Sequence, residues 1–106
     1  MTRPFKNGMK PVHPGEILRE EYLGPLGMSA NRFAAALRIP TNRITEILAE
    51  RRALTADTAL RLARALGTSP EFWLNLQKTY ELREAELEIG AKLKAIKPIA
   101  LTRSAS

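Results

Sequence analysis

The sequence contains no cysteine, and histidine occurs once in its 106 residues. Without cysteine the chain can form no disulfide, no thiolate nucleophile and no cysteine-ligated metal site. The single histidine, His13, precedes Pro14 at the expected start of a helix, where a histidine serves more often as an N-terminal cap than as a base or a metal ligand. Because no residues supply the nucleophile, base or metal set that catalysis needs, the sequence predicts neither an enzyme nor a bound cofactor.

Long apolar runs are also missing. The longest extends from Phe33 to Leu37, far short of the ~20 apolar residues that a membrane helix needs. Basic residues occur among positions 1–10, but no apolar segment follows them as it does in a secretory signal. We therefore expect a cytoplasmic protein without a membrane segment. A length of 106 residues, with 44% hydrophobic and 26% charged residues, is typical of one small globular domain.

Acidic residues are scarce relative to basic ones. Asp and Glu together number 11 against 17 Lys and Arg, which gives a net charge of +6 and an isoelectric point near 10.2. The excess is concentrated in residues 1–64, with a net charge of +5, whereas residues 65–106 carry +1. A basic surface can serve solubility alone, but a strongly basic small domain is also typical of proteins that bind nucleic acids.

Helical periodicity dominates from Pro14 onward, and no window alternates strictly enough for a strand. A flexible arm is expected over residues 1–12, and a basic tail over residues 91–106. The segment between them, 13–90, is predicted to be an all-α DNA-binding and dimerisation domain of five helices. The first helix begins at Pro14 and is stopped by Gly24, Pro25 and Gly27. The other four are expected at residues 30–37, 41–49, 56–66 and 70–90, with Ser29, Thr55 and Ser69 as N-caps and Gly67 as a C-terminal stop.

Two of these helices, residues 30–37 and 41–49, are separated by three residues and favour a helix-turn-helix. In such a motif the second helix enters the major groove of DNA. The face of this helix opposite the apolar positions supplies the candidate base-reading residues Thr41, Asn42, Arg43, Thr45 and Glu46. Residues on either side are candidates for phosphate contacts, namely Ser29, Asn31, Arg32, Arg51 and Arg52. The alternative is an ordinary solvated helix face on which Arg43 and Glu46 pair.

Two segments resemble a known family. Residues 33–48 (FAAALRIPTNRITEIL) are similar to the helix-turn-helix of Cro and phage repressors, in the class named after the xenobiotic response element. Residues 54–77, with the run SPEFWLNLQ, and the opening His13–Glu16 resemble the HigA/VapI antitoxins. The resemblance implies a five-helix repressor-like domain with an extended C-terminal helix. It also implies a dimer that represses its own operon, and an antitoxin that neutralises a RelE-like mRNA endonuclease toxin, HigB.

Two positions depart from the family pattern, and two other functions remain open. Arg38 and Glu50 occupy turn positions where the family usually has glycine with a positive φ. The residues alone also allow a helix-turn-helix regulator that has no toxin partner, and the gene next to this one would distinguish the two. An RNA-binding module would need exposed aromatic stacking platforms, and most of the few aromatic residues fall on predicted core positions instead.

The helix over residues 70–90 carries more large apolar residues than one buried stripe requires. Trp73 is expected to lie in the core of the monomer, whereas Leu82 and Leu87 are the candidates for a homodimer interface. A single helix-turn-helix contacts few base pairs, so a dimer that reads an inverted-repeat operator is expected.

Overall fold

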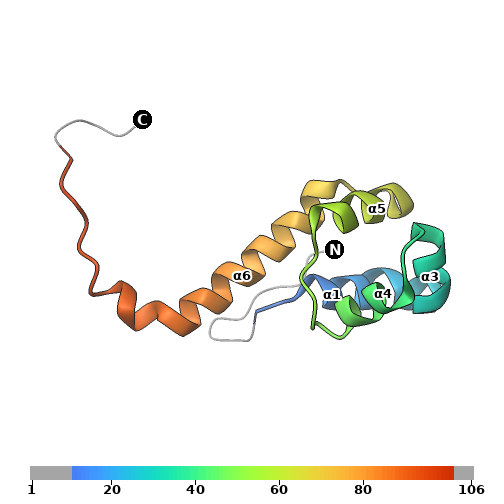
Figure 1. Cartoon of the computed structure of the whole chain (residues 1–106), viewed down its shortest axis with the longest axis horizontal. Coiled ribbons are helices and arrows are strands. Elements are labelled where there is room, and N and C mark those ends of the chain that lie inside the picture. Colours follow the sequence, from blue (N-terminus) through green and yellow to red (C-terminus); the bar gives the residue numbers. More distant parts are fainter. Residues whose placement is uncertain (1–10, 102–106) are drawn as a thin grey trace.

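Helices make up most of residues 11–101, the part of the chain that the computed structural model describes (Figure 1). Pro14–Ile17 (α1), Leu18–Leu23 (η1) and Gly24–Leu26 (α2) form one continuous helical segment. It is followed by α3 (Ala30–Leu37), α4 (Thr41–Leu48), α5 (Ala56–Leu66) and α6 (Pro70–Leu93). No strand occurs within residues 11–101, so the all-α prediction is confirmed, with boundaries that differ at the ends of the first and last helices.

The first helix continues through Gly24 and Pro25, where the sequence predicts its end. Its middle part, η1, is π-helical, and the N–H of Gly24 bonds the carbonyl of Arg19 five residues earlier. Pro25 then lies in the first turn of α2, where its missing N–H is tolerated. The stop is Gly27, whose left-handed φ of 63° ends the segment.

The predicted caps are all present. Ser29, Thr55 and Ser69 accept hydrogen bonds from the backbone N–H three residues later, and Gly67 ends α5 with a φ of 73°. His13 caps α1, because its Nδ1 accepts the N–H of Gly15 at 2.9 Å. The local sequence therefore dictates where four of the helices begin.

The core lies where α1, η1, α3, α4, α5 and the first half of α6 meet. Its fully buried side chains include Trp73, Phe33, Leu18, Ile44, Ile47 and Leu62. The indole N–H of Trp73 donates to Thr68 Oγ1 at 2.7 Å, which satisfies its only polar atom. Trp73 thus belongs to the core of the monomer, as predicted.

Gly15 allows α1 to lie directly against the backbone of α4. A Cβ at this position would lie 1.8 Å from the carbonyl oxygen of Ile47. Only glycine fits such an approach of two backbones. The contact holds the amino end of the first helix against the carboxyl end of α4.

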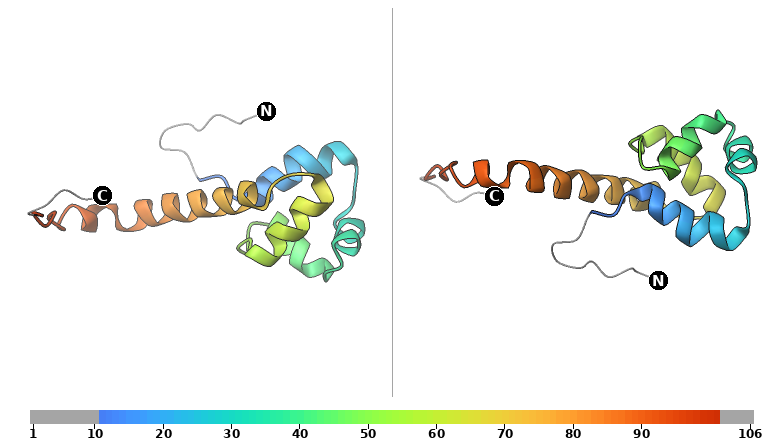
Figure 2. Two further views of the ribbon diagram at one scale, coloured as in Figure 1. Left: turned by 90° about the horizontal axis from the view of Figure 1, so that it is seen from above. Right: turned by 90° about the horizontal axis from the view of Figure 1, so that it is seen from below.

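Beyond Tyr80, α6 leaves the domain (Figure 2). It passes Gly90, where the sequence predicts its end, and continues to Leu93. One glycine in an exposed helix costs only about 1 kcal/mol relative to alanine, and helix-forming residues flank it. Large apolar side chains along the projecting part and the segment after it are exposed, namely Leu82, Leu87, Ile89, Leu93, Ile96, Ile99 and Leu101. None of the helices among residues 11–101 combines the length and apolar character needed to span a bilayer.

Candidate nucleic-acid interface

The turn between α3 and α4 gives these helices the geometry of a helix-turn-helix. Arg38 has a left-handed φ of 60°, and the N–H of Ile39 bonds the carbonyl of Ala34 at 3.1 Å. Glu50, after α4, has a φ of 63°. Both positions therefore have the positive φ expected from the resemblance, although neither is glycine.

The two faces of α4 differ as the sequence predicts. Ile44 and Ile47 are fully buried against the core, while Asn42 and Thr45 are exposed on the opposite side. Thr45 Oγ1 donates to the backbone carbonyl of Asn42. The side chain of Asn42 is exposed and its amide has no hydrogen-bond partner among residues 11–101. A bidentate amide of this kind suits the edge of an adenine in the major groove.

The other three candidate base readers have partners within the chain. Thr41 Oγ1 donates to Asn31 Oδ1 at 2.8 Å. Arg43 Nη1 lies 2.9 Å from Asp57 Oδ1, in α5. These two pairs join α4 to the helix on either side of it.

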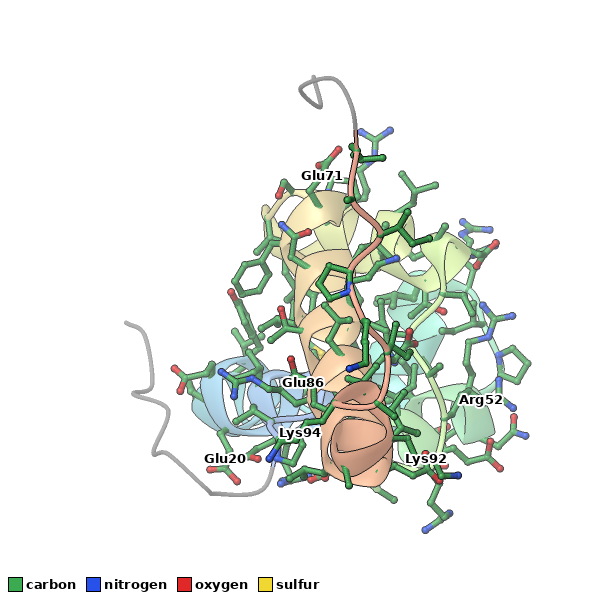
Figure 3. The ribbon with its side chains drawn as sticks, turned by 90° about the vertical axis from the view of Figure 1, so that its left-hand side faces the viewer. Glu20, Arg52, Glu71, Glu86, Lys92 and Lys94 are labelled. Atoms are coloured by element: carbon green, nitrogen blue, oxygen red, sulfur yellow. The ribbon has the colours of Figure 1, made fainter. Side chains whose placement is uncertain are left out.

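The third pair joins Glu46 to Arg52. Nε and Nη2 of Arg52 both lie 2.9 Å from Glu46 Oε1. Arg52 belongs to the segment that links α4 to α5, and Figure 3 shows it at the edge of the domain. The pair neutralises the one acidic side chain on the α4 face. That reduces the repulsion between Glu46 and DNA phosphates.

The candidate phosphate contacts differ in whether their side chains already have a partner in the described part of the chain, as that of Asn31 has in Thr41. Arg32 and Arg51 are exposed, with no salt bridge in the described part of the chain. Ser29 Oγ already accepts the N–H of Arg32, and Arg52 is paired with Glu46. Arg32 and Arg51 lie at the start of α3 and just after α4, so they flank the helix that carries Asn42.

Sequence reasoning missed the residues that hold α4 from outside the motif. Arg19 Nη1 donates to the carbonyl of Leu48 at the end of α4 at 2.6 Å, and its Nη2 lies 3.6 Å from Glu50. Asp57 accepts hydrogen bonds from Arg61 and Arg43. These bonds hold the pKa of the Asp57 carboxyl below its usual value, and the bond from Arg61 has the larger effect. The contacts of Arg19 and of Arg43 join residues 14 to 31 positions apart, which no local spacing indicates. The pair of Asp57 and Arg61, by contrast, has the i,i+4 spacing of a helical ion pair and could have been predicted.

A buried amide side chain on α6 binds the backbone of the loop before α5. Gln77 Oε1 accepts the N–H of Leu54 at 2.8 Å, and its Nε2 donates to Glu81. Among residues 11–101, no three acidic or histidine side chains are grouped so that they could hold a metal ion.

Comparison with known proteins agrees with this geometry. A family model described as helix-turn-helix matches residues 18–73. Virulence-associated protein I of Dichelobacter nodosus is 56% identical over 76% of this chain and 75% of its own length. An addiction module antidote protein of the HigA family from Coxiella burnetii is 53% identical, with a TM-score of 0.82 over 86% of this chain and all of that one.

A further solved structure contains DNA. The antitoxin HigA of Pseudomonas aeruginosa, with the higBA promoter, is 39% identical and has a TM-score of 0.83 over 86% of this chain and all of that one. The chain belongs to the helix-turn-helix family and, within it, to the HigA/VapI antitoxins. This family consists of DNA-binding proteins and not of enzymes.

Proposed function

We propose that this protein is an antitoxin that binds operator DNA at its own promoter through α4 and neutralises a RelE-like toxin. The observation that carries the proposal is the exposed Asn42 amide on a helix flanked by the exposed cations Arg32 and Arg51. The related P. aeruginosa antitoxin, with the promoter of its own operon, supports the same role here. Both partners would be met in the cytoplasm.

In this proposal different residues on and around α4 contact bases and phosphates. Asn42 reads base edges directly, and Thr41 and Glu46 do so after exchanging their internal partners. Thr45 and Arg43 contact the wall of the groove, and Arg43 does so while its guanidinium stays bonded to Asp57. Arg32 and Arg51 bind phosphates directly. Ser29, Asn31 and Arg52 make further phosphate contacts at the edges of the interface. Phosphate contacts set the register, and base contacts supply the sequence preference.

Replacing Asn42 tests the readout. Asn42→Ala is expected to weaken binding to the promoter duplex by about 1–3 kcal/mol and to leave binding to a scrambled duplex nearly unchanged. Asn75→Ala is the matched control, because Asn75 is an exposed asparagine on α6. Fluorescence anisotropy on both duplexes measures the effect. An equal loss on the two duplexes would remove Asn42 from base readout.

The toxin partnership needs a separate experiment. Co-expressed with the product of the neighbouring gene, the protein is expected to form a stable complex and to relieve that product's growth arrest. The contact surface should lie away from α4, so the complex is expected to retain promoter binding. Growth arrest that persists despite ample expression of this protein would favour a regulator without a toxin partner.

A further inference from the structure

One carboxylate joins the two helices of the DNA-binding motif to the helix that follows them. Asp57 Oδ1, in the first turn of α5, accepts Nε of Arg61 at 2.7 Å and Nη1 of Arg43 at 2.9 Å. Arg43 lies in the first turn of α4. A single oxygen atom therefore receives a charged hydrogen bond from each of two helices, and such bonds are stronger than neutral ones.

Arg61 extends this network to the turn of the motif. Its Nη1 donates to the carbonyl of Leu37 at 2.8 Å and lies 3.4 Å from that of Arg38. These carbonyls belong to the end of α3 and to the left-handed turn residue. Since Asp57 holds Nε of the same planar guanidinium, the direction of Arg61 is fixed at both ends.

We propose that Asp57 is a positioning residue for DNA sequence recognition: through Arg61 and Arg43 it fixes the pose of α4 relative to α3 before DNA binds. The inference rests on the proposed operator binding. Asp57 itself does not contact DNA in this scheme. It acts on the two arginines, and a preformed geometry lowers the ordering cost of binding.

The same contact also restrains two cations. Arg43 and Arg61 are attached to Asp57, whereas without it both guanidinium groups could reach phosphates of any sequence. Loss of the carboxylate should therefore weaken operator binding while leaving binding to other DNA unchanged or stronger. Thermal stability should change little, because the Asp57 side chain is 57% exposed and exposed ion pairs contribute little to stability.

The test compares two changes from acid to amide in the full chain. Asp57→Asn removes the carboxylate of the network, and Glu71→Gln is the matched control. Glu71 also lies in the first turn of a helix, and Figure 3 shows it well apart from Arg52 and the loop that follows α4. The probes are a duplex that the wild-type protein selects from a random pool and a scrambled duplex of the same composition.

The measured quantity is the ratio of the two dissociation constants. Asp57→Asn is expected to reduce this preference about tenfold, and Glu71→Gln to leave it unchanged, with both variants folded by circular dichroism. In an Arg43→Gln background the Asp57→Asn change should have a smaller effect, because one of its two partners is gone.

Three results would count against the proposal. If the wild type prefers its selected duplex but Asp57→Asn behaves like Glu71→Gln, or if the effects of Arg43→Gln and Asp57→Asn simply add, Asp57 does not position α4. If the wild type selects no preferred duplex, operator binding itself is wrong, and the role of Asp57 in it fails as well.

Discussion

Two residues adopt a backbone conformation that glycine would adopt more easily. Arg38 and Glu50 have φ values of 60° and 63°, and a left-handed conformation costs a non-glycine residue roughly 1 kcal/mol. Each residue has a compensating contact: the Arg38 carbonyl lies 3.4 Å from Arg61, and Glu50 pairs with Arg19. The motif therefore keeps its geometry at both ends of α4 without glycine.

Replacing Arg38 with glycine should leave the protein as stable or slightly more stable. Glycine removes the left-handed penalty of roughly 1 kcal/mol, but its larger unfolded-state entropy returns about 0.4–1 kcal/mol. We expect a free energy of unfolding between that of the wild type and about 0.5 kcal/mol above it, and above that of Arg38→Ala. Urea denaturation measures both variants. A glycine variant less stable than the alanine variant would contradict the left-handed turn.

His13 should make stability depend on pH. Its Nδ1 accepts the N–H of Gly15, which requires the neutral ring, and burial lowers the pKa of His13 below 6.5 despite the opposing effects of Glu50, the Arg52 backbone and Glu84. A lowered pKa means that the folded state prefers the neutral form. The stabilisation is therefore complete above pH 6.5 and is lost as the pH falls through and below that value.

The measurement is the free energy of unfolding at a series of pH values from about 8 down to about 5. His13→Asn provides the control, because asparagine is an N-cap that does not titrate. The wild type is expected to lose stability more steeply than this variant below pH 6.5. Parallel curves would mean that His13 does not link protonation to folding.

At the scale of the elements, the sequence predicted the helices well and the contacts between them poorly. Local signals such as Ser29, Thr55 and Ser69 act within one turn, so the starts of α3, α5 and α6 could be predicted. Of the three residues predicted to stop the first helix, Gly27 does so, but Gly24 and Pro25 do not, because a π-helical turn leads into a further helical turn. The predicted end at Gly90 was wrong, because good helix-forming neighbours override a single glycine. The pairing of Asp57 with Arg43 depends on how α4 and α5 pack, which no local spacing encodes.

The contact between α1 and α4 should tolerate no side chain at position 15. Gly15→Ala would place a methyl group against the Ile47 carbonyl oxygen, since the Cβ position lies 1.8 Å from it. The helices must separate, and we expect a loss of about 3 kcal/mol, the upper part of the usual range for overpacking. Gly90→Ala is the control, because a Cβ there meets nothing within 4 Å, and it should be neutral or stabilising. Thermal unfolding distinguishes the two.

The two arginines after α4 should contribute unequally to DNA binding. Arg51 is exposed, so Arg51→Gln is expected to flatten the dependence of log K on log salt by about 0.9. Arg52 must first leave Glu46, so Arg52→Gln is expected to change the slope less. Arg83→Gln, on the projecting part of α6, should not change it. Anisotropy titrations at several salt concentrations give the slopes, and equal slopes for Arg51→Gln and wild type would place Arg51 off the DNA.

The whole molecule is elongated, 55 × 29 × 26 Å, with the helix-turn-helix at one end and the projecting half of α6 at the other (Figure 1). A helix of this length without tertiary contacts is only marginally stable in water. Its exposed leucines and isoleucines therefore favour a partner. Because that surface lies apart from α4, a partner bound there leaves the DNA-reading face accessible.

We predict that this partner is a second copy of the chain. Leu82, Ala85, Ile89 and Leu93 fall within about 80° of arc on α6, whereas Leu87 lies about 140° around the helix from Leu82. A helix paired along the side of α6 that carries Leu82, Ile89 and Leu93 would cover these side chains more completely than it covers Leu87. Leu82→Lys is therefore expected to raise the dissociation constant of the dimer by at least about tenfold, since burying a leucine contributes about 1.5–3 kcal/mol, and Leu87→Lys to raise it less.

Light scattering across a concentration series measures the molar mass of the protein in solution and so shows whether it is a dimer. The dissociation constants for a full inverted repeat and for one half-site show how the dimer affects DNA binding. A dimer should bind the full repeat far more tightly, with half-site centres about 10 base pairs apart or a multiple of that distance. Loss of the dimer in Leu82→Lys should remove this advantage while the affinity for one half-site stays the same, because Leu82 is exposed on α6, outside the helix-turn-helix. A monomeric wild type at micromolar concentration that binds one half-site as tightly as the full repeat would overturn the dimer and the role of α6 together.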